Sequence, residues 1–143
     1  MTPRIKALDH LVLTVADIAV TVDFYTHVLG MQAESFTPAG GAPRMALHFG
    51  SQKINLHRTG AVFRPHAGNV QAGSADLCFL SDTPLADWQA HLSAKAVQIE
   101  EGPLRRTGAE GPLMSIYLRD PDGNLIEISN RLPASCYLPR GVT

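Results

Sequence analysis

The chain has 143 residues, a length that fits one ordinary domain or two small modules. Hydrophobic residues make up 45% of it and charged residues 17%, so it can bury a core, and wholesale disorder is excluded. The formal charge of -1 argues against a nucleic-acid-binding protein. No apolar run approaches the roughly 18 residues of a membrane span, and the charged N-terminus is unlike a signal peptide. We therefore expect a cytoplasmic protein that contacts neither nucleic acid nor membrane.

The first group of predicted elements occupies about residues 8–57. Residues 8–15 alternate and are rich in Leu and Val, which is typical of a strand. Asp17 is suited to cap a helix over 18–30, and Gly30 is a good terminator for it. Three short strands are then predicted, over 31–37, 44–50 and 53–57.

The second group occupies about residues 75–129, after a predicted long loop over 58–74. Its pattern predicts a helix over 85–95 and strands over 75–80, 97–101, 113–120 and 125–129. A second long loop is expected over 102–112 and a tight turn over 121–124, whereas the chain from residue 130 on resembles an irregular tail. Strand, helix and three strands thus occur twice, which predicts two like modules with a cleft between them as the default site.

Four polar residues occupy matching places in the two halves. His10 lies in the first strand of one half and Asp76 at the same place in the other; Asn55 and Glu127 lie in the last strands. Because side chains alternate along a strand, His57 shares a face with Asn55. Nitrogen and oxygen donors suit divalent zinc, manganese, iron or nickel. We expect such an ion to be held by His10, Asp76, Glu127 and, as a fourth candidate, His57. Alternation alone leaves open that Glu127 faces solvent on an ordinary two-sided strand.

The sequence resembles the vicinal oxygen chelate superfamily in three strings: DHLVLTVAD, FYTHVLGM and YLRDPDGNLIEIS. That superfamily contains glyoxalase I, extradiol dioxygenases, fosfomycin-resistance thioltransferases and bleomycin-resistance proteins. The resemblance covers about residues 7–130, and the strings GSQKINLH and GSADLCFL are similar to a subgroup of glyoxalase-domain and virulence-associated proteins. It implies an α+β fold, with two paired βαβββ modules forming a cup-shaped mixed sheet in a single domain over 1–143. It also implies a homodimer.

The resemblance carries over to individual positions, with two departures. His10 matches the family's first-strand metal ligand and Glu127 its last-strand glutamate. Asp76 stands where the family usually has a histidine, and Asn55 stands where glyoxalase I has the glutamate that acts as its base. His57, two residues further on, is a candidate to replace that base or to serve as a ligand.

These departures shape the expected function. Extradiol dioxygenases use two histidines and one carboxylate, and Asp76 breaks that set unless His57 completes it. The resemblance therefore favours a metal-dependent lyase or isomerase, with Glu127 and His57 as catalytic residues, acting on a small substrate that has adjacent oxygens. An extradiol-type dioxygenase and a non-catalytic, antibiotic-type binding protein, as in bleomycin resistance, stay open as alternatives.

Other residues are candidates for binding the substrate. Arg106 and Thr107 lie in the predicted second loop, where an arginine beside a hydroxyl suits an anion-binding lid. His66 in the first loop is a candidate acid or base, and Tyr117 could point its phenol into the cup. With Asn55 these complete the expected substrate-binding set.

The two cysteines are too few for a disulfide scaffold. They are Cys78 and Cys136, and they lack zinc-site spacing. Cys78 lies in an apolar run, so we expect it to be a buried small hydrophobic residue.

Overall fold

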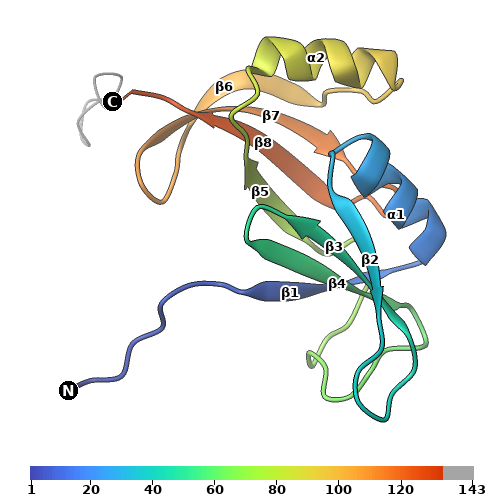
Figure 1. Ribbon diagram of the computed structural model, residues 1–143. Coiled ribbons are helices and arrows are strands. Elements are labelled where there is room, and N and C mark those ends of the chain that lie inside the picture. The colour runs from blue at the N-terminus through green and yellow to red at the C-terminus, as the bar shows by residue number, and fades with distance from the viewer. Residues whose placement is uncertain (134–143) are drawn as a thin grey trace. The chain divides into compact units, whose positions relative to one another are not determined.

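The computed structural model describes residues 1–133 and divides into two compact units, residues 1–75 and the part that begins at Asp76. The first unit contains β1 (His10–Val15), α1 (Ile18–His27), β2 (Gln32–Phe36), β3 (Arg44–Phe49) and β4 (Gln52–Arg58). The second contains β5 (Asp76–Leu80), α2 (Leu85–Ala94), β6 (Glu101–Thr107), β7 (Pro112–Arg119) and β8 (Leu125–Arg131). The predicted order of one strand, one helix and three strands is confirmed in both units (Figure 1).

Each unit forms a four-stranded mixed sheet with the same topology. The strand orders are β1-β4-β3-β2 and β5-β8-β7-β6. In each, the first strand pairs in parallel with the last, and the other pairs are antiparallel. The predicted α+β class is thus confirmed.

The first sheet has one apolar face and one polar face. Leu13, Ile54 and Leu56 are almost fully buried, and α1 packs against β2, β3 and β4. Burial of each such side chain contributes roughly 1.5–3 kcal/mol. The helix begins as predicted, since the Asp17 carboxylate accepts the backbone N–H of Val20 at 3.1 Å. This packing leaves the alternate side chains of β1 and β4 on the opposite face.

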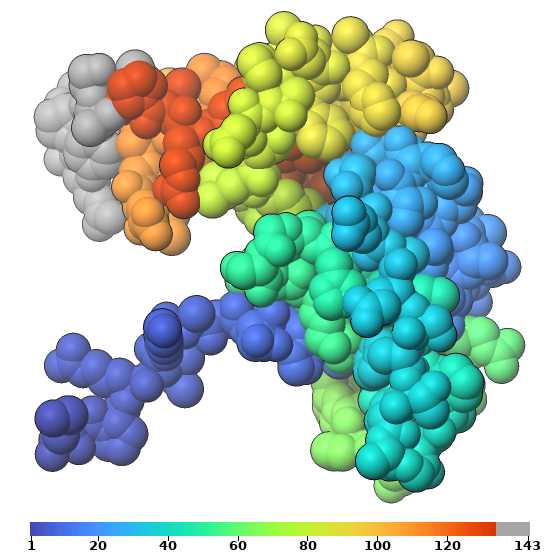
Figure 2. Space-filling model, viewed as in Figure 1, coloured from blue at the N-terminus to red at the C-terminus, as the bar shows by residue number. Residues whose placement is uncertain are grey.

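The N-terminal segment extends away from the body of the first unit, as Figure 2 shows. Its apolar side chains Ile5 and Leu8 are exposed. The side-chain amide of Gln52 donates to the Leu8 carbonyl at 2.9 Å and holds the base of this segment beside β1. Between residues 1 and 133, neither helix is long and apolar enough to cross a membrane.

Asn130 caps the second helix, although the sequence pattern places it in an irregular tail. The residue lies in β8, and its Oδ1 accepts the Leu85 N–H at 2.9 Å at the start of α2. Its Nδ2 donates to the carbonyls of Ser81 and Thr83. Because Pro84 offers no side-chain cap, Asn130 satisfies a helix N–H that would otherwise lack a partner. The remainder of the predicted tail from residue 134 on, with Cys136, lies outside the described residues.

The predicted boundary of the sixth strand is wrong. The structure has β6 over 101–107, followed by a short turn. These take the place of the strand expected over 97–101 and the loop expected over 102–112. Gly and Pro in the string GPLRR favour a loop by composition, but β6 lies at the sheet edge, where proline is tolerated. At Gly102, φ is +101° and a Cβ would collide with the Ser115 carbonyl, so the strand starts where only glycine fits. Arg106 and Thr107 consequently project from a strand.

The turn over 121–124 has the predicted position and is closed by Asp120. Its Oδ1 accepts the backbone N–H groups of Asp122 and Asn124, both at 2.9 Å, and its Oδ2 accepts the Asn124 side-chain amide at 2.8 Å. Asp120 and Asn124 are both buried. This turn sets where β8 begins and therefore the position of Glu127 along it.

We predict that Asp120→Ala lowers the free energy of unfolding by about 1–3 kcal/mol, because buried N–H donors of the turn lose their acceptor. Urea unfolding monitored by circular dichroism measures the change. Asp82→Ala, which removes an exposed carboxylate from another loop of the same unit, serves as the control and should stay near the wild type. Equal stability of both variants would contradict the assignment of this turn.

Candidate functional site

Glu127 is the centre of a polar cluster on the second sheet. It pairs with Tyr117 on β7 and with Cys78 on β5, and Ser129 two residues later pairs with Ser115. Since cross-strand partners share a face, all five side chains project to the same side of the sheet.

Two serine hydroxyls hold the Glu127 carboxylate. Ser115 Oγ donates to Glu127 Oε2 at 2.6 Å, and Ser129 Oγ donates to the same oxygen at 3.1 Å. Both serines are fully buried, whereas Glu127 is only partly exposed. Glu127 is therefore not a freely solvated strand residue, which was the alternative left open by the sequence.

Arg106 is fixed against Tyr117. Its Nε donates to the Tyr117 hydroxyl at 2.8 Å and its Nη1 to the Arg105 carbonyl at 3.1 Å. Burial raises the pKa of Tyr117; the nearby Glu127 also raises it, while the hydrogen bond from Arg106 opposes the rise. Tyr117 is therefore a neutral phenol at physiological pH, and it connects Arg106 with Glu127.

A cavity of about 480 Å³ opens beside this cluster, entirely within the second unit. Arg106, Thr107, Glu127 and Cys78 line it. The expectation that Cys78 is buried is wrong, because Leu77 and Phe79 take the inward positions of β5 and leave the thiol exposed. Partial desolvation raises the pKa of the Cys78 thiol, whereas its hydrogen bond with Ser129 has a smaller, lowering effect on that pKa. Cys78 is thus a thiol and not a thiolate at neutral pH.

His10 and Asp76 occupy the same register position in their two sheets. His10 pairs with Lys53, two residues before Asn55, and Asp76 pairs with Leu125, two residues before Glu127. Each candidate on a first strand thus shares a face with the candidate on its last strand. Asp76 is exposed at the start of β5.

The His10 ring is oriented by its neighbour. Its Nδ1 lies 2.8 Å from Asp9 Oδ2. A carboxylate accepts only, so this contact places the ring hydrogen on Nδ1 and leaves the lone pair of Nε2 for another partner. Carboxylate–histidine pairs of this kind orient metal ligands in many proteins.

Asn55 carries an unsatisfied polar atom. The residue is 8% exposed, and its Oδ1 is buried with no hydrogen-bond partner among residues 1–133. A buried amide oxygen without a donor is costly. It is therefore an available acceptor on the polar face of the first sheet.

His57 is buried and neutral. It is 4% exposed, and its Nδ1 faces the backbone N–H of Phe63 at 3.5 Å, with the two rings in edge contact. Burial lowers the pKa of His57; Arg44 and then His66 lower it further. Because Nδ1 accepts, the remaining hydrogen lies on Nε2, which makes His57 a hydrogen-bond donor.

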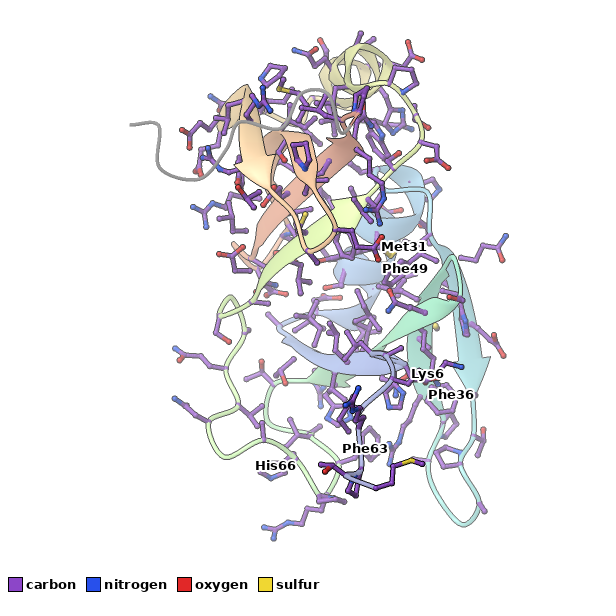
Figure 3. All side chains as sticks on the ribbon, turned by 90° about the vertical axis from the view of Figure 1, so that its left-hand side faces the viewer. Lys6, Met31, Phe36, Phe49, Phe63 and His66 are labelled. Atoms are coloured by element: carbon purple, nitrogen blue, oxygen red, sulfur yellow. The ribbon has the colours of Figure 1, made fainter. Side chains whose placement is uncertain are left out.

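His57 and His66 line a second cavity of about 210 Å³, within the first unit. Its other walls come from β1 and from the loop after β4, where Phe63 and His66 lie (Figure 3). The predicted long loop over 58–74 is confirmed, since no strand or helix is formed between residues 59 and 75.

The predicted site residues thus divide between the two units. His10, Asn55, His57 and His66 belong to the first unit; Asp76, Arg106, Thr107, Tyr117 and Glu127 belong to the second. Within the described part of the chain, no three His, Cys, Asp or Glu side chains lie close enough to form a metal-binding group. Sequence reasoning missed Ser115, which the β7–β8 register brings to Glu127, and Arg131, which lines the same cavity four residues further along β8. Only Ser129, at i+2 from Glu127, carried a readable signal.

A family model described as the Glyoxalase/Bleomycin resistance protein/Dioxygenase superfamily matches residues 7–128. The chain therefore belongs to this superfamily, as its resemblance indicates.

Several proteins are closely similar to this chain. It is 53% identical over 126 residues to glyoxalase domain-containing protein RDO1 of Mycosarcoma maydis, a match that covers 88% of this chain and 69% of that protein. It is 53% identical over 125 residues to virulence protein STM3117 of Salmonella typhimurium, covering 87% and 84%. An integron cassette protein from the mobile metagenome of V. cholerae has a solved structure that superposes with a TM-score of 0.87 at 57% identity, covering 92% and 100%.

More distant solved structures share the fold alone. One is titled a lactoylglutathione lyase from Agrobacterium tumefaciens, at 22% identity and a TM-score of 0.65. Another is titled an antibiotic-binding protein from Streptomyces, at 18% identity and a TM-score of 0.70. The fold therefore accommodates both an enzyme and a binding protein, and the site has to distinguish them.

We predict that His57→Gln makes the stability of the protein less sensitive to acid. The pKa of His57 in the folded chain lies below its ordinary value of 6.5. The stability supplied by the neutral ring is therefore fully present above that pH and is lost as the pH falls through the lowered pKa. Thermal unfolding midpoints measured from about pH 7.5 to about pH 4.5 test this. His27→Gln, at an exposed position in α1, controls for the loss of one imidazole, and identical acid profiles for wild type and His57→Gln would contradict the prediction.

Proposed function

We propose that this protein is a divalent-metal-dependent enzyme of the vicinal oxygen chelate type, with a lyase or isomerase activity on a small substrate that has two adjacent oxygens. One observation carries the proposal: two donors of ligand type, His10 and Glu127, are each oriented by neighbouring polar groups. Asp9 orients His10, and Ser115 and Ser129 orient Glu127. Such orientation reduces the cost of binding an ion and is characteristic of metal sites.

The predicted ligands are donors of the types that a divalent ion takes. His10, Asp76 and Glu127 would hold it, with one nitrogen and two carboxylates, a set that suits zinc, nickel, manganese or iron. His57 is the fourth predicted ligand, but an Nε2 that carries a hydrogen favours a donor role toward substrate for this ring. When bound, the ion would supply Lewis-acid stabilisation of negative charge on the substrate oxygens.

The protein's own groups would then position the substrate and move a proton. Glu127 is the proposed proton-transferring carboxylate, because Asn55, at the matching place in the first unit, is an amide and takes up no proton. The buried Oδ1 of Asn55 would accept a hydrogen bond from a substrate hydroxyl, and the Nε2–H of His57 would donate to a substrate oxygen. Tyr117, as a neutral phenol between Arg106 and Glu127, would support the carboxylate during transfer.

We predict that His10→Ala and Glu127→Ala each lose bound metal while staying folded. Elemental analysis of protein purified without chelator, after re-addition of zinc, manganese, iron or nickel, measures occupancy. Asp9→Asn should weaken metal affinity by about 10–100-fold, because it removes the carboxylate that orients His10. His27→Ala removes an exposed helix histidine and should keep full occupancy.

Two results of that experiment would overturn the metal proposal. Full occupancy in both alanine variants would show that the ligand set is wrong. An absence of any metal in the wild type, together with saturable binding of small ligands without turnover, would favour an antibiotic-type binding protein instead.

We further predict that the protein is a homodimer and that mixing two inactive variants reveals where the site closes. If one ion is shared between modules of different chains, a heterodimer of His10→Ala and Glu127→Ala retains one intact ligand set. If the site closes within one chain, that heterodimer retains none. Metal occupancy after the two variants are unfolded and refolded together distinguishes these outcomes, with separately refolded variants as the control. A monomer in sedimentation analysis would contradict the predicted dimer.

A further inference from the structure

The cavity of the second unit is suited in size and lining to a small ligand. Its volume of about 480 Å³ falls in the range of about 300–1,000 Å³ that is usual for such sites. Arg106, Thr107 and Arg131 supply cations and a hydroxyl, and Leu80 supplies apolar surface. Leu80, the last residue of the edge strand β5, is 52% exposed and leaves an apolar wall open to a ligand.

Arg106 is a fixed cation that pairs with no carboxylate among residues 1–133. Two of its three guanidinium nitrogens are used, by Tyr117 and by the Arg105 carbonyl. Among residues 1–133, Nη2 makes no hydrogen bond and no carboxylate lies within ion-pair distance of the guanidinium. A guanidinium held in place by neutral groups is already organised to bind an anion, since little side-chain entropy is lost on binding.

Within the described residues, 1–133, the ion pair that Arg131 makes is a weak one. Its Nη1 lies 3.6 Å from Glu110 Oε2, beyond ordinary hydrogen-bond distance, and both side chains are more than half exposed. Exposed pairs of this kind contribute little to stability. A ligand anion can therefore replace the Glu110 carboxylate at a small cost.

Glu110 is carried by a tight turn between β6 and β7. The Gly108 N–H donates to the Gly111 carbonyl at 2.8 Å and closes the turn. A Cβ at Gly108 would come within 2.9 Å of the Leu113 side chain, so the turn is closely packed. Exchange of the Glu110 side chain thus requires a rotation of that side chain and no opening of the turn.

We propose that this cavity binds the anionic group of a small organic acid or phosphate ester through Arg106 and Arg131. In the free protein the Glu110 carboxylate lies near the Arg131 guanidinium, and the anion of the ligand displaces it. The apolar part of the ligand lies along Leu80. Because Glu127 lines the same cavity, an anion held at the arginine end places the rest of the ligand against the carboxylate proposed to transfer a proton. The inference rests on the proposed function in one respect: it names the substrate class of that site.

The test uses the full chain, stripped of metal, so that binding is measured without turnover. The probes are inorganic phosphate, butyrate and butyramide, titrated at constant ionic strength and followed by the arginine side-chain NMR resonances and by thermal shift. Saturable binding of phosphate or butyrate, with none of the neutral butyramide, is expected. Phosphate and butyrate separate the two sources of the anion, and the tighter of them defines the ligand class.

Matched variants identify the groups that bind the anion. Arg106→Gln and Arg131→Gln should each weaken binding by at least about 10-fold, whereas Glu110→Gln should strengthen it several-fold, because the internal competitor loses its charge. Arg119→Gln is the control, since this arginine of the same sheet pairs with Glu100 and does not line the cavity. Circular dichroism confirms folding of each variant, and Arg131→Gln tests the site even if the Arg106 variant unfolds.

Two outcomes would overturn the inference: no saturable binding of either anion, or equal binding by wild type and both arginine variants. Failure here is distinguishable from failure of the metal proposal, because His10 does not line this cavity. If His10→Ala loses its metal but the wild type binds neither anion, the inferred substrate class is wrong and the metal proposal stands. Anion binding by a wild type that takes up no metal would support the inference and overturn the metal-dependent enzyme.

Discussion

The parallel pairing of the first strand with the last strand decides, in each unit, which side chains can act together. A shift of one residue in this register would turn every polar candidate to the apolar face. The observed pairing instead puts His10 with Asn55, and Asp76 with Glu127, in the same relation on equivalent faces. Two sheets with little sequence identity thus present the same arrangement of donors.

Neutral groups orient the charged groups at the candidate site. Serine hydroxyls hold Glu127 and a phenol holds Arg106, so among residues 1–133 neutral groups, and not opposite charges, orient both side chains. In the first unit, two histidines have different surroundings and therefore different roles in hydrogen bonding. An exposed carboxylate orients His10, whereas His57 is buried, neutral and a hydrogen-bond donor. Charges that are positioned but unpaired are what the binding of an ion or a charged substrate requires.

Much of the fold follows from local patterns in the sequence. The strand–helix–three-strand repeat, the Asp17 cap and the turn over 121–124 each depend on residues near one another in the chain, and each is confirmed. The sixth strand was misplaced because Gly102 and Pro103 locally favour a loop, while pairing with β7 makes them the start of an edge strand. Cys78 is exposed although its run is apolar, because an apolar run does not show which of its alternate residues face inward.

The sequence by itself determined the family, the repeated modules and the polar residues at matching strand positions, because these depend on periodicity and short motifs. Only the tertiary structure decided which groups surround them. Ser115 on β7 donates to Glu127 on β8, and Glu110 in the turn after β6 lies near Arg131 on β8, through a register that no local pattern specifies. Register is set by the packing of a whole sheet face, so side chains that are far apart in the chain meet only once the sheet has formed.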